Sequence, residues 1–385
     1  MANTLTSLIP DVYAALDVVS RELVGILPAM SMDATYTRAA VGQNVRVFVA
    51  PASSMTDITP GVTPPDDGDQ TIGNVNMTIT KAKRSPIRWN GEQTLGINNG
   101  GPGTSAIIQN QVAQSIRVIV NAMEADAAAL VLQASRATGI AGTSPFASNL
   151  TDTAQCRKIL SDNGAPLSDL HMIIDTTSGA AMRTLTQLTK ANEAATDSTL
   201  RQGVLLDIHG FAIRESAQIL TPAIGTSNNA GTSNSAGYAI GSTAITMVAA
   251  GTGTILAGDI VTFTGDTNKY VVSIGVASLA VGGVLTLSAP GLRKALAASP
   301  VTCTVVAAST RNMFFSRNAI ALAARLPALP DGGDLAVDRT TITDPRSGMS
   351  FELSLYPQFR QMQYEISAAW GTAMVKPEHC GVLLG

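Results

Sequence analysis

The sequence predicts an α+β fold, in which one long helix and several pairs of strands build a body that a separate all-β segment interrupts. Apolar residues recur at steps of three and four along one stretch of about 25 residues, which is typical of an amphipathic helix. Apolar residues alternate at 349–356 and at 361–371, which is typical of paired strands. Between Gly225 and Ala308 only five residues are charged, and the pattern has period two. The 385 residues suffice for two or more domains, because single cores stop growing near roughly 250–300 residues.

The first hundred residues predict a helix followed by a long arm. Asp11 is a favourable N-cap, and apolar residues at helical spacing predict a helix over 11–25. A strand at 44–50, a loop rich in Pro, Asp and Gly at 51–70, and extended chain at 72–93 predict a two-stranded arm. The tip of this arm is acidic and its base is basic. The tip carries Asp66, Asp67 and Asp69, and the base carries Lys81, Lys83, Arg84 and Arg88.

A long helix is predicted next, with Thr104 or Ser105 as its cap. The seam runs for about 25 residues, which corresponds to about 38 Å of helix. Its other faces are also fairly apolar, so we expect neighbours on several sides. The seam residues are Ile108, Val112, Ile116, Ile119, Met123, Ala127 and Leu130.

The middle of the chain predicts an inserted domain. Residues 170–177 are typical of a buried strand, after which Ser178 can cap a helix, and residues 204–216 continue as strands. Residues 226–237 have the composition of a flexible linker. They open the charge-poor segment, and mixed helix and strand patterns resume after it. We therefore expect residues 226–308 to fold as an autonomous domain.

Composition limits the function classes. Charged residues are 14% of the chain, against about 25% for ordinary soluble proteins, which favours extensive self-association. The net charge of −3 provides no basic field for tight nucleic-acid binding. Three widely spaced cysteines, Cys156, Cys303 and Cys380, do not indicate a disulfide framework. Residues 270–292 are uncharged and long enough for a membrane span, but their glycines, Pro290 and β-branched residues favour strands.

No pattern of catalytic or ligand-binding residues stands out. The three histidines, His171, His209 and His379, have no second ligand at metal spacing. The glycines of residues 251–258 are misplaced for a dinucleotide loop, and the acidic run at 65–69 lacks the spacing of an EF-hand. We therefore expect no catalytic residue, no metal site and no cofactor.

The order of the predicted parts resembles that of tailed-bacteriophage major capsid proteins. Three stretches carry the resemblance: "LRQGVLLDIHGFAIRES" at 200–216, "AGDIVTFTG" at 257–265 and "WGTAMVKPEHCGVLLG" at 370–385. The inserted β-segment is similar to the β-barrel insertion domain in coat proteins of short-tailed phages. The insertion is shorter than that lineage leads one to expect. The arm also has no lysine between Asn44 and Thr80, where covalent cross-linking in such a loop would need one.

The resemblance implies a domain plan and a set of partners. The N-terminal arm with its helix would span 1–43, the extended loop 44–93, and the peripheral domain with the spine helix 94–160. The apical domain would span 161–225 and 309–385, interrupted by a β-barrel at 226–308. The chain would form hexamers and pentamers of an icosahedral shell around double-stranded DNA, with portal and scaffolding proteins as partners. It would contact no membrane, and it would belong to the virion after assembly in the host cytoplasm.

Two other functions remain open at this point. One is a bacterial nanocompartment shell of the same fold that encloses an enzyme cargo, and the other is a soluble α/β enzyme. Within the shell hypothesis, an extended hairpin holds its tip and base roughly 40 Å apart, at about 3.3 Å per residue over twelve residues. We therefore predict that the acidic tip and the basic base defined above make intersubunit contacts. A solvated tip is the alternative.

Overall fold

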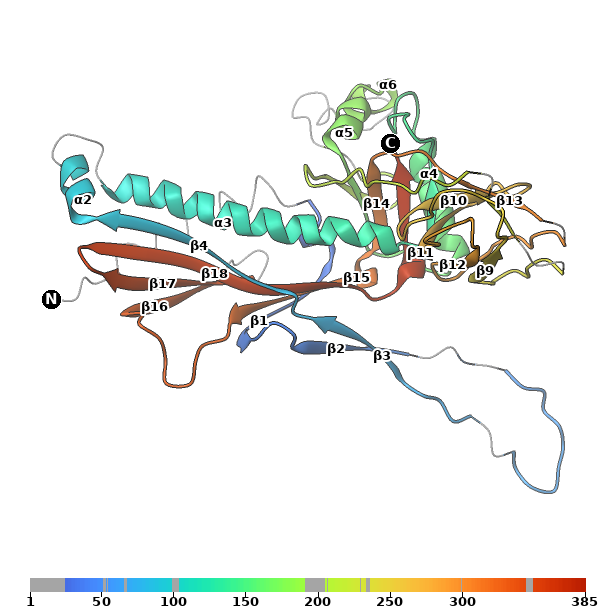
Figure 1. The fold of residues 1–385 in the computed structure, drawn as a ribbon, viewed down its shortest axis with the longest axis horizontal. Coiled ribbons are helices and arrows are strands. Elements are labelled where there is room, and N and C mark those ends of the chain that lie inside the picture. The colour runs from blue at the N-terminus through green and yellow to red at the C-terminus, as the bar shows by residue number, and fades with distance from the viewer. Residues whose placement is uncertain are drawn as a thin grey trace.

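The computed structural model describes residues 25–385 except 51–52, 54, 66–67, 99–103, 191–204, 206, 229, 233–235, 299 and 344–348. The helix predicted over 11–25 therefore lies almost entirely outside the described residues. One long helix runs lengthwise over a sheet, and a second group of strands and short helices lies at one end of that helix (Figure 1). The predicted α+β class is confirmed.

The first sheet is built around one long strand, β18 (Gln361–Met374). Along one edge β18 pairs with β4 (Lys81–Asn90). Along its other edge it pairs first with β17 (Ser350–Gln358) and then with β15 (Ile320–Pro327). Two outer strands complete the sheet: β16 (Asp338–Thr343) beside β17, and β1 (Ser31–Ala39) parallel to β15.

The long helix α3 (Thr104–Ala129) covers one face of this sheet (Figure 1). The predicted seam is buried from Val112 to Leu130, and Ile108 is half-buried against the same core. The helix ends at Ala129, and residues 130–133 tighten into a 3₁₀ turn, η3 (Leu130–Gln133), so the last residue of the seam, Leu130, lies in that turn. The preceding helix is short, α2 (Gly91–Asn98). Trp370, Phe351 and Ile366 from the sheet pack into the core that α3 covers.

The second sheet joins strands from outside the predicted insertion to strands within it. Its path begins with β7 (Phe211–Glu215), β6 (Leu170–Ile174), β14 (Arg311–Ser316), β19 (Cys380–Leu384) and β5 (Arg136–Thr138). It continues through β11 (Lys269–Ile274), β10 (Ile260–Phe263), β13 (Thr302–Val305) and β8 (Ala230–Gly231). Three short helices belong to the same part of the structure: α4 (Thr151–Asp162), α5 (Thr176–Arg183) and α6 (Thr186–Thr189).

The cap predicted for the helix after β6 was wrong. Asp175, not Ser178, precedes α5, and its side chain accepts hydrogen bonds from the backbone N–H groups of Thr177 and Ser178. Asp175 directly follows the buried strand, so its carboxylate reaches the first free amides of the helix. Ser178 lies inside the helix.

Strands between residues 230 and 305 form a closed ring. β11 also pairs with β12 (Gly283–Leu287), and β12 pairs with β9 (Ala244–Met247). An isolated bridge between Thr232 and Met247 links β9 back to the end of β8. The ring encloses its own apolar core, which includes Phe263, Tyr270 and Leu285. Residues 270–292 form β11, β12 and their connections, and the part of the chain that the structure describes contains no helix long and apolar enough to cross a membrane.

Residues 44–78 form an arm outside both sheets. β2 (Asn44–Val49) and β3 (Gly73–Thr78) pair with each other as a two-stranded ribbon. The chain between them extends far from the body (Figure 1). We call residues 44–78 the arm, and residues 78–81, where it meets the first sheet, the arm root.

Candidate functional site

The ribbon of the arm has one face directed at the body. Val45, Val47 and Val49 alternate with exposed residues and are half-buried, which is the period expected for a strand with one covered face. Phe48 points the other way and is 73% exposed. A two-stranded ribbon is marginally stable alone in water, so this ribbon depends on what it packs against.

Beyond the ribbon, the arm bares large apolar side chains. Met55 is 100% exposed, Ile58 98% and Val62 106%, so they are as open to solvent as in an unfolded chain. Pro60, Pro64 and Pro65 lack backbone N–H groups, so this part of the chain cannot form a regular ladder of its own. Contiguous exposed apolar residues of this kind mark interaction surfaces. Met55, Ile58 and Val62 therefore form an apolar surface that lies open within the described chain.

The residues predicted to make intersubunit contacts have different surroundings in the structure. Asp66 and Asp67 lie outside the described residues, and Asp69 is exposed. Lys81 Nζ lies 2.5 Å from Asp126 Oδ1, and Arg84 Nη1 lies 2.6 Å from Glu365 Oε2. Arg88 donates to Gln363 Oε1 at 3.3 Å, and Lys83 is exposed.

Lys81, Arg84 and Arg88 of the predicted basic cluster therefore have partners within their own chain. The hydrogen bond that Arg84 donates to Glu365, together with the negative charge of Glu365, raises the pKa of Arg84. The basic cluster accordingly tethers β4 to its neighbours. Whether these residues also meet the acidic tip of another subunit stays a prediction.

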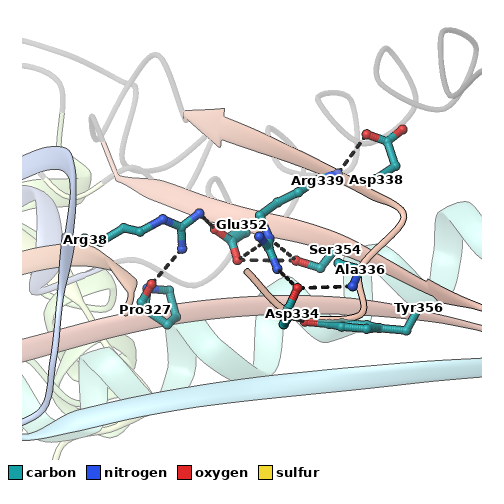
Figure 2. A network of polar contacts seen from close by, with 9 residues as sticks. All are labelled: Arg38, Pro327, Asp334, Ala336, Asp338, Arg339, Glu352, Ser354 and Tyr356. Carbon is teal, nitrogen blue, oxygen red and sulfur yellow. Dashed lines mark hydrogen bonds and ion pairs between the residues drawn. The ribbon is translucent and has the colours of Figure 1, made fainter. Parts of the chain in front are cut away.

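A polar network lies where β1 leads into the arm, and the sequence reasoning missed it (Figure 2). Arg38 donates to the carbonyl of Pro327 at 2.7 Å and to Glu352, which is only 3% exposed. Glu352 also lies 3.2 Å from Arg339 Nε. Glu352 lies on β17, and its carboxylate thus connects Arg38 of the outer strand β1 with Arg339 of the outer strand β16.

The network continues to the loop between β15 and β16. Asp334 accepts from the Tyr356 hydroxyl at 2.7 Å and lies 2.5 Å from Arg339. The Tyr356 bond, with the Ala336 amide and Arg339, holds the pKa of Asp334 below its usual range. The carboxylate therefore stays charged and fixes the loop against the sheet near the start of the arm.

The described residues contain no cluster of three His, Cys, Asp or Glu side chains that could hold a metal ion. Burial raises the pKa of Cys303 to about 12 and raises that of Cys156 and Cys380 as well, so these thiols are not reactive thiolates. Burial lowers the pKa of His171, whose Nε2 lies 2.9 Å from Asp169. His209 Nδ1 lies 2.6 Å from the hydroxyl of Thr153. Thr153 is itself buried, so we interpret this hydrogen bond as part of the packing of the fold.

A groove of about 1040 Å³ opens at the end of the first sheet that lies near α2. Its lining includes aromatic and apolar side chains from β4, β18 and α3. Phe359 is 89% exposed at its rim, in the turn between β17 and β18. The groove is a second apolar surface of the body, in addition to the arm. Its apolar lining residues include Trp89, Leu95, Ile108, Met362 and Tyr364.

Comparison with known proteins found similar solved structures, all at low sequence identity. No family model matches the sequence, and no curated protein matches it. The capsid of the cyanophage P-SCSP1u matches with a TM-score of 0.49 and 10% identity, over 92% of this chain and 86% of that chain. A virus-like particle from Pyrococcus furiosus matches with a TM-score of 0.45 and 10% identity, over 97% and 98%. An encapsulin complex from Synechococcus elongatus matches with a TM-score of 0.39 and 9% identity, over 94% and 88%.

The matching structures are mainly phage capsid proteins, which is the class that the sequence resembles.

Proposed function

We propose that the chain is the major capsid protein of a tailed bacteriophage, which self-assembles into the icosahedral shell enclosing the double-stranded DNA genome. The observation that carries this proposal is the arm, whose apolar side chains are bare within the subunit. Burying one such side chain contributes about 1.5–3 kcal/mol. Three of them on each subunit offer a repeated driving force for association.

The arm also determines the kind of assembly. An arm that covers a different surface on the next copy makes a head-to-tail contact, and such contacts close into rings when the rotation between copies allows it. Hexameric and pentameric rings are the units that an icosahedral shell requires. The arm is therefore suited to ring formation between identical chains.

DNA is enclosed rather than bound in this proposal. The net charge of −3 gives the subunit no basic field for phosphates, so the shell retains its contents by closure. Portal and scaffolding proteins belong to the proposal as assembly partners in the host cytoplasm, and enzymatic activity does not. We assign the closed ring of strands between β8 and β13 to the insertion domain of the short-tailed lineage.

Assembly of the purified full-length chain tests the shell. Electron microscopy should show closed particles of uniform diameter. Replacing Met55, Ile58 and Val62 together with serine should abolish the particles and leave the subunit melting temperature unchanged, since these side chains have no contacts to lose. Monomers of the unaltered chain under every condition would refute the proposal.

The contents of the particles separate this function from a nanocompartment. Particles purified from the producing cells and treated with nuclease should retain double-stranded DNA. A folded enzyme in place of DNA would instead identify a nanocompartment shell.

A further inference from the structure

The arm leaves the body at one crossing point over β18. The Thr80 amide donates to the carbonyl of Trp370 at 3.0 Å. A Cβ at Gly371 would lie 1.9 Å from the carbonyl oxygen of Thr78, which is closer than any real side chain comes. Only glycine therefore permits the arm root to lie directly on the sheet at this point.

One carboxylate ties three parts of the molecule together at the same point. Asp126, on α3, receives the Lys81 ammonium at 2.5 Å on Oδ1 and the Trp370 indole N–H at 2.8 Å on Oδ2. Trp370 is fully buried, and a buried indole N–H needs an acceptor. Asp126 thus joins the long helix, the central strand and the arm root.

The outgoing and returning segments of the arm are both attached at this root. The Ile79 carbonyl accepts from the Gly42 amide at 2.9 Å, and the Ile79 amide donates to the Gln43 carbonyl at 2.9 Å. Met77 and Ile79 are buried against a floor of small side chains from β15 and β18. The outgoing and returning chains are therefore fixed to each other at the root. The floor consists of Ala321, Ala323 and Ala369.

The arm acts as a long lever on this root. Sixteen residues separate Val62 from Thr78, a span of at most about 50 Å at about 3.3 Å per residue. A rotation of one degree at the root therefore displaces the exposed apolar residues by about 1 Å, a distance comparable with the fit of packed surfaces. Small rotations at the root therefore produce displacements of the exposed apolar residues that are large on the scale of side-chain packing.

We propose that Asp126, Lys81, Trp370 and Gly371 are positioning residues that set the direction of the arm relative to the long helix, and thereby the curvature of the shell. This inference rests on the proposed shell function and adds the residues that select shell size. The chemistry is the charge-assisted bond of Lys81 with Asp126, which holds β4 against α3 beside a contact that only glycine allows.

Three variants and one control test the inference in the full-length chain. Lys81→Met removes the ammonium and leaves the bond between Trp370 and Asp126, so the subunit stays folded. Asp126→Asn weakens both bonds. Lys81→Arg keeps the charge and should restore the unaltered behaviour. Glu365→Gln is the matched control, because it breaks the ion pair with Arg84 on the same two strands but away from the crossing.

Particle diameter and subunit melting temperature are the two measurements. Shells of the unaltered chain, Lys81→Arg and Glu365→Gln should share one diameter. Lys81→Met and Asp126→Asn should shift or broaden the diameters, or lose closed shells, without a comparable fall in the melting temperature of Lys81→Met.

The outcomes separate the two proposals. Failure of the unaltered chain to form shells would count against the proposed function. Unchanged diameters in Lys81→Met would overturn the positioning role and leave the function standing, and so would an equal change in Glu365→Gln. If Asp126→Asn does not fold, Lys81→Met alone decides, because Lys81 is partly exposed.

Discussion

The arm and the closed ring of strands are built from similar residues but meet water in opposite ways. Both are rich in Val, Thr and Gly. In the ring, the bridge between Thr232 and Met247 returns the last strand to the first, so the strands enclose a core and leave little open edge. In the arm, β2 pairs only with β3, and the apolar residues beyond the ribbon are bare.

The difference lies in closure rather than in composition. Six strands can surround Phe263 and Leu285, whereas two strands have no interior. The ring is complete as one chain. The arm leaves Met55, Ile58 and Val62 exposed, and in the proposed shell a neighbouring subunit covers them.

The largest expected loss of stability comes from a substitution in the core of the ring. Phe263 is 2% exposed, and its ring centroid lies 6.1 Å from that of Tyr270. Phe263→Ala should lower the free energy of unfolding by about 3–5 kcal/mol. Chemical denaturation of the dissociated subunit measures it. Val284→Ala, on the exposed side of β12, is the control and should change stability by no more than about 0.5 kcal/mol. Equal effects would show that the ring has no packed core.

The next largest loss of stability is expected on α3, in the body to which the arm and the ring attach. Ile119 and Val118 are neighbours on α3, but Ile119 is 3% exposed and Val118 is 62% exposed. Ile119→Ala should cost about 2–5 kcal/mol because it leaves a cavity under the helix. Val118→Ala should stay within about 0.5 kcal/mol in the dissociated subunit. Thermal or denaturant unfolding of both variants measures these losses. A larger loss of stability in Val118→Ala than in Ile119→Ala would show that the helix register is wrong.

The sequence predicted such elements well where local periodicity reports burial directly. The seam of α3 and the alternation of β17 and β18 depend on residues a few positions apart, so the spacing alone predicts the element type and its buried face. The cap before α5 was harder, because Asp175, Thr177 and Ser178 are all good capping residues and only the end of the strand decides among them.

Contacts between remote segments could not be predicted. Arg38 and Glu352 are 314 positions apart, and Lys81 and Asp126 are 45 apart. A charged residue on a strand carries no local signal of its partner. The arm showed the same limit: its extended character was visible in the sequence, but its root on Gly371 requires the sheet to be known.

A smaller effect concerns the segment that enters the body at Gly25. Glu124 is fully buried on α3, and Oε1 accepts from the amides of Gly25 at 2.9 Å and Ile26 at 3.1 Å. Burial raises the pKa of Glu124 above its ordinary value of 4.5, although hydrogen bonds from Ser216 and these amides oppose the rise. The folded state therefore holds a proton that the unfolded state releases, and stability from this group falls as the pH rises above about 4.5 through the raised folded pKa.

Glu124→Gln should remove this loss, since glutamine stays neutral and keeps an oxygen for both amides. Stability of the variant relative to the unaltered subunit should therefore increase with pH above 4.5. Denaturation curves across this range measure the difference. Parallel pH profiles would mean that burial does not control this carboxyl.

The smallest effect is expected at the tip of the arm, where the comparison with the ring is most direct. The ring keeps Asp266 at 9% exposure, where it accepts from the Tyr270 hydroxyl at 2.6 Å, whereas Asp69 on the arm is exposed. We predict that Asp66, Asp67 and Asp69 meet basic residues of a neighbouring subunit. One exposed ion pair contributes only about 0–1 kcal/mol and is screened by salt, but a shell repeats it at every subunit.

Replacing the three aspartates of the tip with lysine should therefore slow or misdirect assembly at low salt, and this defect should diminish as salt is added. The melting temperature of the subunit should stay nearly constant, because Asp69 is exposed. Light scattering during assembly at two salt concentrations measures the effect, and Asp57→Lys elsewhere on the arm is the control for added charge. Normal assembly of the triple variant at low salt would show that the tip is only solvated, and that the bare apolar residues alone attach the arm to its neighbour.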